Sequence, residues 1–119
     1  MSTTQQQPPE LKAYNDKMNQ LQDVMLNRQR LLTQKNENDM VKKELEILED
    51  DDIIYKLEDG QLKEEDPLEA EMCVDQRLEY LESELKKCDV KEADLQAQVK
   101  ECQKKLADIQ KAALAGQSK

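Results

Sequence analysis

Few side chains in this sequence of 119 residues are of a kind that does chemistry, and their spacing does not form a site. Cys73, Cys88 and Cys102 lie fifteen and fourteen residues apart, and the chain has no histidine. Three thiols without a close pair do not suit a disulfide framework, and without His or C-x-x-C they do not suit zinc. We therefore expect reduced cysteines, no metal and no cofactor, as in a cytosolic or nuclear protein.

Acid–base and nucleophilic catalysis are also hard to build from these residues. The chain lacks an imidazole base, a glycine-rich phosphate loop and a G-x-S-x-G elbow. Its 27 acidic residues are not expected inside a dry cleft, where the pKa of a carboxyl would be shifted to use. We predict that the protein is not an enzyme.

The charge of the chain argues against nucleic acid as a partner, and its lack of a long apolar stretch argues against a membrane span. The net charge is −9, whereas a nucleic-acid binder needs a basic stripe. No apolar stretch approaches the roughly 20 residues of a membrane span. Residues 44–75, here called the acidic block, hold fourteen carboxylates against two lysines. Three roles stay open for this block: a solvated surface, pairing with a basic partner chain, or keeping this part of the protein from sticking to other polypeptides.

The elements that must position these side chains are long helices. The chain is 38% charged and only 3% aromatic, with two glycines and three prolines, which is typical of a coiled coil. From Val74 onward, apolar residues recur in alternating steps of four and three, the spacing that keeps one stripe toward a supercoiling partner. Glu92 alone interrupts this seam. Its members are Val74, Leu78, Leu81, Leu85, Cys88, Leu95, Val99, Cys102, Leu106, Ile109 and Ala113.

A weaker helical pattern precedes it, in two registers offset by one residue. The offset near Leu31 and Leu32 predicts a register discontinuity in the coil. The first register consists of Leu11, Tyr14, Met18, Leu21, Met25 and Leu32, with Arg28 as a charged interruption. The second consists of Leu31, Asn38, Val41, Leu45 and Leu48.

A β-hairpin is predicted between the two helices. Four acidic residues from Glu49 end the first pattern, since carboxylates are unfavourable at a helix C-terminus. A strand-like run is followed by Asp59-Gly60, which suits a type I′ turn because both central residues of that turn need positive φ. The sequence thus predicts one domain at 10–114, with a helix at 10–49, a hairpin at 53–66 and a helix at 68–114. Residues 1–9, which do not resemble a secretory signal, and residues 115–119 are predicted to be a disordered arm and tail.

The predicted fold is mainly α: an antiparallel two-helix coiled coil with one β-hairpin at its base. Tyr14 is expected opposite Ile109, and Leu48 opposite Val74 or Asp75. Because an isolated two-stranded hairpin is marginal in water, we expect an oligomer built through the hairpins. The expected assembly residues are Ile53, Ile54, Tyr55, Lys56, Leu57 and Leu62. The other ends of the helices form a tip, where apolar residues without a fixed partner are expected: Leu11, Tyr14, Met18, Leu21, Leu106, Ile109 and Leu114.

The chain from about Tyr14 to Leu106 resembles the β-type subunits of prefoldin, most closely the subunit-6 type of the eukaryotic complex. A leucine zipper would share the leucines by chance, but not the polar residues at these offsets or the hairpin between them. The resemblance rests on Arg28-Gln29, Leu31, Gln34, Glu37-Asn38, Val41-Lys42, Glu44-Leu45, Leu48, Ile54-Tyr55-Lys56-Leu57, Val74, Arg77-Leu78, Tyr80-Leu81 and Glu84-Leu85.

The resemblance implies an ATP-independent holding chaperone. Members of this family assemble as hexamers of two α-type and four β-type subunits, and a β-type subunit has one hairpin, as predicted here. Their coiled-coil tips hold unfolded chains, in eukaryotes chiefly actin and tubulin, and pass them to the cytosolic group II chaperonin. The resemblance thus implies that the seven tip residues named above bind client proteins. The second strand departs from the family pattern, because Leu62 is its only apolar residue. Contact on that side would be weaker or rely on charge.

Other interpretations of the chain and of single residues stay open. The chain could instead be a structural coiled-coil scaffold or tether, or belong to a prefoldin-like assembly with another task. We interpret Cys88 and Cys102 as core packing, and Met40 and Met72 as filler. Met18 and Met25 suit either the seam or client contact, and Lys56 suits either the outward barrel face or protection of a sheet edge.

Overall fold

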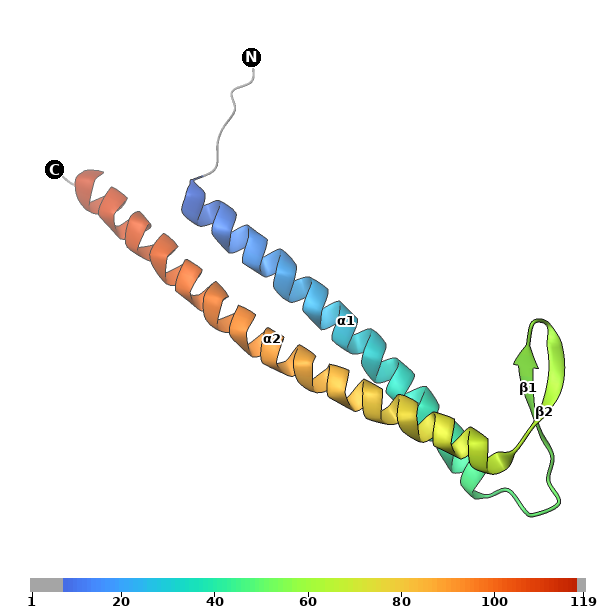
Figure 1. The fold of residues 1–119 in the computed structure, drawn as a ribbon. Helices are drawn as coiled ribbons and strands as arrows, with labels where there is room; N and C mark the ends of the chain where they lie inside the picture. Colours follow the sequence, from blue (N-terminus) through green and yellow to red (C-terminus); the bar gives the residue numbers. More distant parts are fainter. Residues whose placement is uncertain (1–7, 118–119) are drawn as a thin grey trace. The chain divides into compact units, whose positions relative to one another are not determined.

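The structure, a computed structural model, describes residues 8–117. Its elements are α1 (Pro9–Glu46), β1 (Ile54–Glu58), β2 (Gln61–Glu65) and α2 (Pro67–Gln117), in that order (Figure 1). The described residues form two compact units: Arg28–Lys87, the hairpin unit, and the segments on either side of it, the terminal unit. Each helix contributes one segment to each unit. The predicted fold class, mainly α with one antiparallel hairpin, is confirmed.

The helices end at slightly different residues from those predicted. α1 ends at Glu46 because the acidic residues after it form a turn of their own. In that turn the backbone N–H of Glu49 donates to Oδ2 of Asp52 at 2.7 Å, and the N–H of Asp52 donates to the carbonyl of Glu49 at 3.0 Å. Such side-chain bonds compete with the helix. α2 continues to Gln117, so 115–117 are helical, while 1–7 and 118–119 of the predicted arm and tail lie outside the described residues.

Asp66 caps the start of α2. Its Oδ1 accepts a hydrogen bond from the backbone N–H of Leu68 at 3.1 Å, and its carbonyl accepts one from the N–H of Ala70 at 3.0 Å. Pro67 follows at the first helical position, where a missing N–H costs nothing. Glu69 stands where a capping box has its acidic residue. Asp66 is thus both the N-cap of α2 and the single residue between β2 and α2.

The hairpin has the turn that the sequence predicts. β1 and β2 pair antiparallel, from Ile54 opposite Glu65 to Glu58 opposite Gln61. Asp59 and Gly60, at the turn, have φ values of 52° and 77°. Two positive φ values in a two-residue loop match the right-handed twist of the strands that it joins.

The core lies almost entirely along α2. Seven of the eleven predicted seam residues of α2 are buried. The other four lie near the end of the helix and are half-buried or exposed, and Glu92, the charged interruption, is half-buried. In the hairpin unit the buried seam residues are Val74, Leu78, Leu81 and Leu85, and in the terminal unit they are Cys88, Leu95 and Val99. α1 contributes Leu31 alone to the buried set.

The seam of α1 is continuous, and the predicted discontinuity near Leu31 and Leu32 is wrong. Met18, Met25 and Leu32 are exposed by 38–50%, and the positions one residue before them are the less exposed ones. Long Lys and Arg side chains cover apolar surface with their stems while their charges stay in water. A pattern that counts only apolar residues therefore misses them. The sheltered positions are Tyr14, Lys17, Leu21, Val24, Arg28, Leu31, Lys35, Asn38, Lys42 and Leu45.

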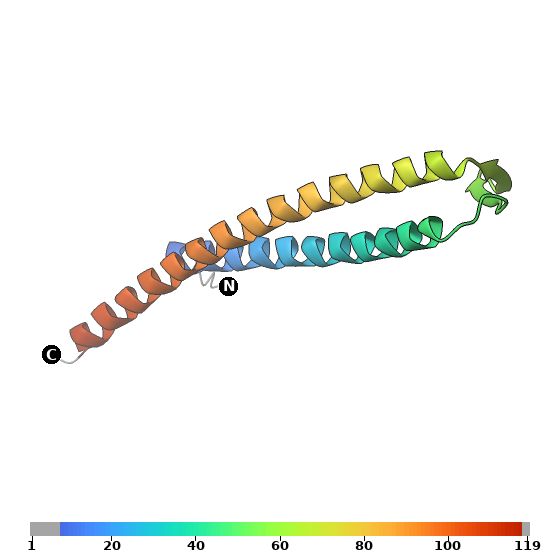
Figure 2. The same cartoon turned by 90° about the horizontal axis from the view of Figure 1, so that it is seen from below.

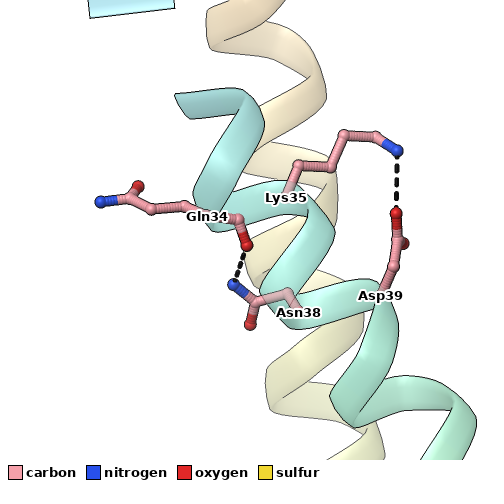
Figure 3. Close-up of polar contacts among 4 residues, drawn as sticks. All are labelled: Gln34, Lys35, Asn38 and Asp39. Carbon is pink, nitrogen blue, oxygen red and sulfur yellow. Dashed lines mark hydrogen bonds and ion pairs between the residues drawn. The ribbon is translucent and has the colours of Figure 1, made fainter. Parts of the chain in front are cut away.

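Polar residues in the middle of α1 form hydrogen bonds and ion pairs within their own helix. Asn38 donates from Nδ2 to the carbonyl of Gln34 at 2.8 Å, and Lys35 pairs through Nζ with Asp39 at 3.1 Å (Figure 3). These contacts join residues one turn apart, where helical neighbours lie close. The polar groups of this stretch therefore have partners without crossing to α2.

The two helices pair about two turns away from the expected register. Asn27 donates to Sγ of Cys88 at 3.7 Å in the terminal unit, and Lys42 Nζ lies 2.8 Å from Oδ1 of Asp75 in the hairpin unit. The cause is the unequal length of the connections: seven residues, 47–53, join α1 to β1, but Asp66 alone joins β2 to α2. The expected register took the turn at Asp59-Gly60 as the midpoint, whereas the helix ends set the pairing.

We expect Asp66→Ala to lower the free energy of unfolding by about 1 kcal/mol, because the first N–H groups of α2 lose their cap. Chemical denaturation of the full chain, followed by circular dichroism, measures this change. Asp51→Ala is the matched control, since it removes the same charge from an exposed residue outside any helix. Equal losses for the two variants would contradict the cap.

We also expect Leu81→Ala to lower the free energy of unfolding by about 2–5 kcal/mol, because Leu81 is only 4% exposed and its loss leaves a cavity. The neighbouring Tyr80 is 61% exposed, so Tyr80→Ala should cost less than about 1 kcal/mol. Thermal and chemical denaturation compare the two variants. A larger loss for Tyr80→Ala would place the seam on the wrong face of α2.

Candidate functional site

The hairpin has two chemically different faces. Directly opposite residues of an antiparallel pair share a face, and successive residues alternate between faces. One face, the apolar face, therefore carries Tyr55 and Glu64 as one pair and Leu57 and Leu62 as another. The other, the lysine face, carries the remaining three pairs. These are Ile54 with Glu65, Lys56 with Lys63, and Glu58 with Gln61.

The base of the hairpin lies toward the helices of its own unit. Ile54 and Glu65 are the two strand residues that are not exposed. They line a cavity of about 280 Å³ between the hairpin and the helix ends. The other lining residues are Val41, Leu45, Tyr55, Lys56, Ala70, Cys73, Val74 and Arg77. The lysine face is therefore partly covered within the chain.

The lysine face also contains an unfavourable pair. Lys56 and Lys63 stand directly opposite each other, and like charges in that position destabilise a sheet. Glu58 and Glu65 lie on the same face, one pair away on either side. Part of the acidic block thus offsets the two lysines within the hairpin itself.

The apolar face has large apolar side chains in contact with solvent. Tyr55 is 56% exposed, and Leu57 and Leu62 are each 70% exposed. Ile53, just before β1, is 61% exposed. Both strands are edge strands, because the sheet has only two. Each edge presents backbone N–H and C=O groups that another strand could pair with.

The six predicted assembly residues are thus divided between surfaces. Tyr55, Leu57 and Leu62 lie together on the apolar face, and Ile53 precedes it. Ile54 and Lys56 lie on the lysine face, and both line the cavity, as does Tyr55. The prediction took the six residues as one set, although strand alternation divides them between two faces.

In the terminal unit, α2 continues past the start of α1 (Figures 1 and 2). Lys17 shares a surface pocket with Gln98, Glu101 and Cys102. Asn27 lies beside Cys88 and Lys17 beside Cys102. In an antiparallel pair this register places Pro9, the first residue of α1, beside about residues 106–110 of α2. About the last two turns of α2 therefore have no α1 segment alongside them. The predicted contact between Tyr14 and Ile109 does not form.

The predicted tip residues differ in how much surface they offer. Ile109 and Leu114 are 45% and 65% exposed, and Met18 is 39% exposed. The other four members are half-buried against the opposite helix segment: Leu11, Tyr14, Leu21 and Leu106. All seven lie in the terminal unit. Of these seven residues, the two most exposed therefore lie on the overhanging end of α2.

Two features of these surfaces were missed in the sequence. Glu64 shares the apolar face with three large apolar residues, yet a single carboxylate inside an acidic block gives no pattern signal. The overhang of α2 could have been found from the unequal connection lengths, since the acidic turn and Pro67 mark the helix ends. Neither feature depends on long-range information.

The charged groups outside the hairpin have structural rather than chemical roles. The hydrogen bond from Lys42 to Asp75, together with the charge of that carboxylate, raises the pKa of Lys42 above its ordinary value. Both side chains are well exposed, so the pair fixes register more than it stabilises the fold.

Cys88 is buried, Cys102 half-buried and Cys73 exposed, and all three are free thiols.

Within residues 8–117, no three acidic or thiol side chains converge into a group that could hold a metal ion. Neither helix in this range has an apolar stretch suited to crossing a bilayer.

Comparison with known proteins agrees with this architecture. The family model described as "Prefoldin subunit" matches residues 9–113. Prefoldin subunit 6 of Saccharomyces cerevisiae is 37% identical over 83 residues, which cover 70% of this chain and 73% of that protein. Prefoldin subunit 6 of Homo sapiens is 32% identical over 87 residues, which cover 73% of this chain and 67% of that protein.

A solved structure is similar over nearly the whole chain. The crystal structure of the prefoldin beta subunit from Thermococcus strain KS-1 matches with a TM-score of 0.76 and 26% sequence identity. The match covers 92% of this chain and 96% of that one. The chain therefore belongs to the prefoldin family, whose subunits are cochaperones and not enzymes.

Proposed function

We propose that this chain is a β-type subunit of a hexameric, ATP-independent prefoldin in the cytosol. Its hairpin joins α-type and β-type prefoldin subunits into one assembly. The ends of its helices bind unfolded polypeptides of the actin and tubulin type, which the assembly delivers to the group II chaperonin. No cofactor takes part in this cycle.

The observation that carries this proposal is the overhanging end of α2. Ile109 and Leu114 are exposed there beyond the start of α1. An unfolded chain offers apolar side chains in no fixed geometry, so a smooth helical surface with a few aliphatic groups suits it. Each contact is weak, and several subunits in one assembly supply the affinity through avidity.

The hairpin supports assembly through a different surface. Its apolar face exposes an aromatic and two leucine side chains, and its two edges are open. A two-stranded hairpin of this kind gains stability by pairing with further strands. A coiled-coil scaffold or tether would need only a tight loop between its helices, so the hairpin favours the prefoldin proposal over that alternative.

We expect the tagged chain, purified from its own cytosol, to appear in native mass spectrometry as one hexamer. The hexamer should contain one copy of this chain and five other small coiled-coil subunits. A homodimer or a set of filamentous partners would contradict the proposal and favour the scaffold. A hexamer with prefoldin-like subunits that does not suppress client aggregation would favour an assembly with another task.

We expect the double variant Ile109→Ser and Leu114→Ser to weaken binding of an unfolded client by about tenfold, because burying an aliphatic side chain contributes about 1.5–3 kcal/mol. Suppression of actin aggregation by the assembled complex measures this effect. Val90→Ser is the matched control, since Val90 is 63% exposed on the same helix before the overhang. Loss of assembly in the double variant, or an equal effect of Val90→Ser, would remove the client-binding role from this end.

A further inference from the structure

Glu64 is the one charged residue on the apolar face of the hairpin. Within β1 and β2 this face consists of Tyr55, Leu57, Leu62 and Glu64, and all four are exposed. The other charged residues of the two strands, Lys56, Glu58, Lys63 and Glu65, lie on the lysine face. Glu64 is thus a carboxylate at the border of an apolar surface.

Covering the apolar face would change the surroundings of Glu64. A strand that pairs with the edge of β2 places its side chains next to those of Leu62 and Glu64, with opposite residues about 4.5–5.5 Å apart at Cβ. A third and fourth strand would also remove water from the face. A carboxylate that loses its water is tolerated in a protein only when a cation or several hydrogen-bond donors replace that water.

The two edges of the hairpin therefore suit different partner strands. A strand on the β1 edge lies beside Tyr55 and Leu57, so apolar groups alone suit it. A strand on the β2 edge lies beside Leu62 and Glu64, so it needs an apolar group and a cation on the same face. In a strand, two residues on one face are separated by an even number of positions.

A second copy of this chain does not meet that requirement. Both lysines of the hairpin, Lys56 and Lys63, lie on the lysine face. If two copies pair with their apolar faces on the same side, Glu64 stands beside Ile53, Tyr55, Leu57, Leu62 or another Glu64, depending on the strand and register. A one-residue shift brings a lysine beside Glu64 but turns the apolar face of that copy to the opposite side. The acidic block adds repulsion between the two copies.

We propose that the β2 edge docks a strand of a different prefoldin subunit that carries Lys or Arg opposite Glu64, in phase with its apolar residues. Glu64 then selects the neighbour by charge, and it disfavours pairing of the chain with itself. The inference rests on the proposed function, since it assumes assembly with other prefoldin subunits. It adds the edge, the residue and the chemistry of the partner.

The test is reconstitution of the full-length chain with the other prefoldin subunits of its source, followed by native mass spectrometry and titration. We expect Glu64→Lys to weaken incorporation by roughly a hundredfold, because it sets two cations against each other. Glu64→Gln should weaken it by about tenfold. Asp51→Lys is the matched control, with the same change of charge at an exposed residue of the acidic block outside both strands, and should change incorporation by less than about threefold.

Circular dichroism of each variant keeps loss of folding apart from loss of docking, since both helices lie outside β2. Crosslinking the assembled complex identifies the neighbour's residue opposite Glu64, and reversal of that residue to Glu should restore incorporation of Glu64→Lys. If the wild-type chain assembles and Glu64→Lys assembles equally well, the inference is overturned while the proposed function stands. If the wild-type chain joins no prefoldin subunit, the proposed function fails, and the inference fails with it.

Discussion

The apolar stripe along α2 is the constraint from which the other features follow. Among residues 8–117, eight of the nine buried side chains belong to this helix, and α1 supplies only Leu31. α1 covers the stripe with leucines, a tyrosine and the stems of lysine and arginine side chains, whose charges reach water at the sides. Within residues 8–117, α1 is the helix that covers this stripe. Apolar groups of the hairpin and of the overhanging α2 end lie outside the part that α1 covers, and they stay exposed.

The sequence predicted those elements that depend on local periodicity. The four-and-three spacing located the seam of α2, and Asp59-Gly60 located a turn with two positive φ values. The register between the helices was not predictable in the same way. It depends on the difference between a seven-residue and a one-residue connection, and therefore on where each helix stops. The acidic turn after Glu46 decides one of these ends through its own hydrogen bonds.

The candidate surfaces were predicted by segment but not by residue. An alternating strand gives two sets of side chains, and the sequence does not tell how close each lies to the helices. Ile54 is half-buried at the base of the hairpin, whereas Tyr55 and Leu57 of the same run are exposed. In α1 the apolar pattern included exposed methionines and left out sheltered lysines such as Lys17. Both differences arise because residue type alone does not give the position of a side chain in the fold.

The connection through Asp66 has a mechanical consequence. A single capping residue between β2 and α2 leaves no backbone slack, so this strand and helix of the hairpin unit move as one lever. On the other side, seven residues, 47–53, join α1 to β1, and the acidic turn lies among them. A displacement of α1 can be distributed over this longer connection, whereas the same displacement of α2 reaches β2 through Asp66 alone. The sheet is therefore coupled more tightly to α2 than to α1.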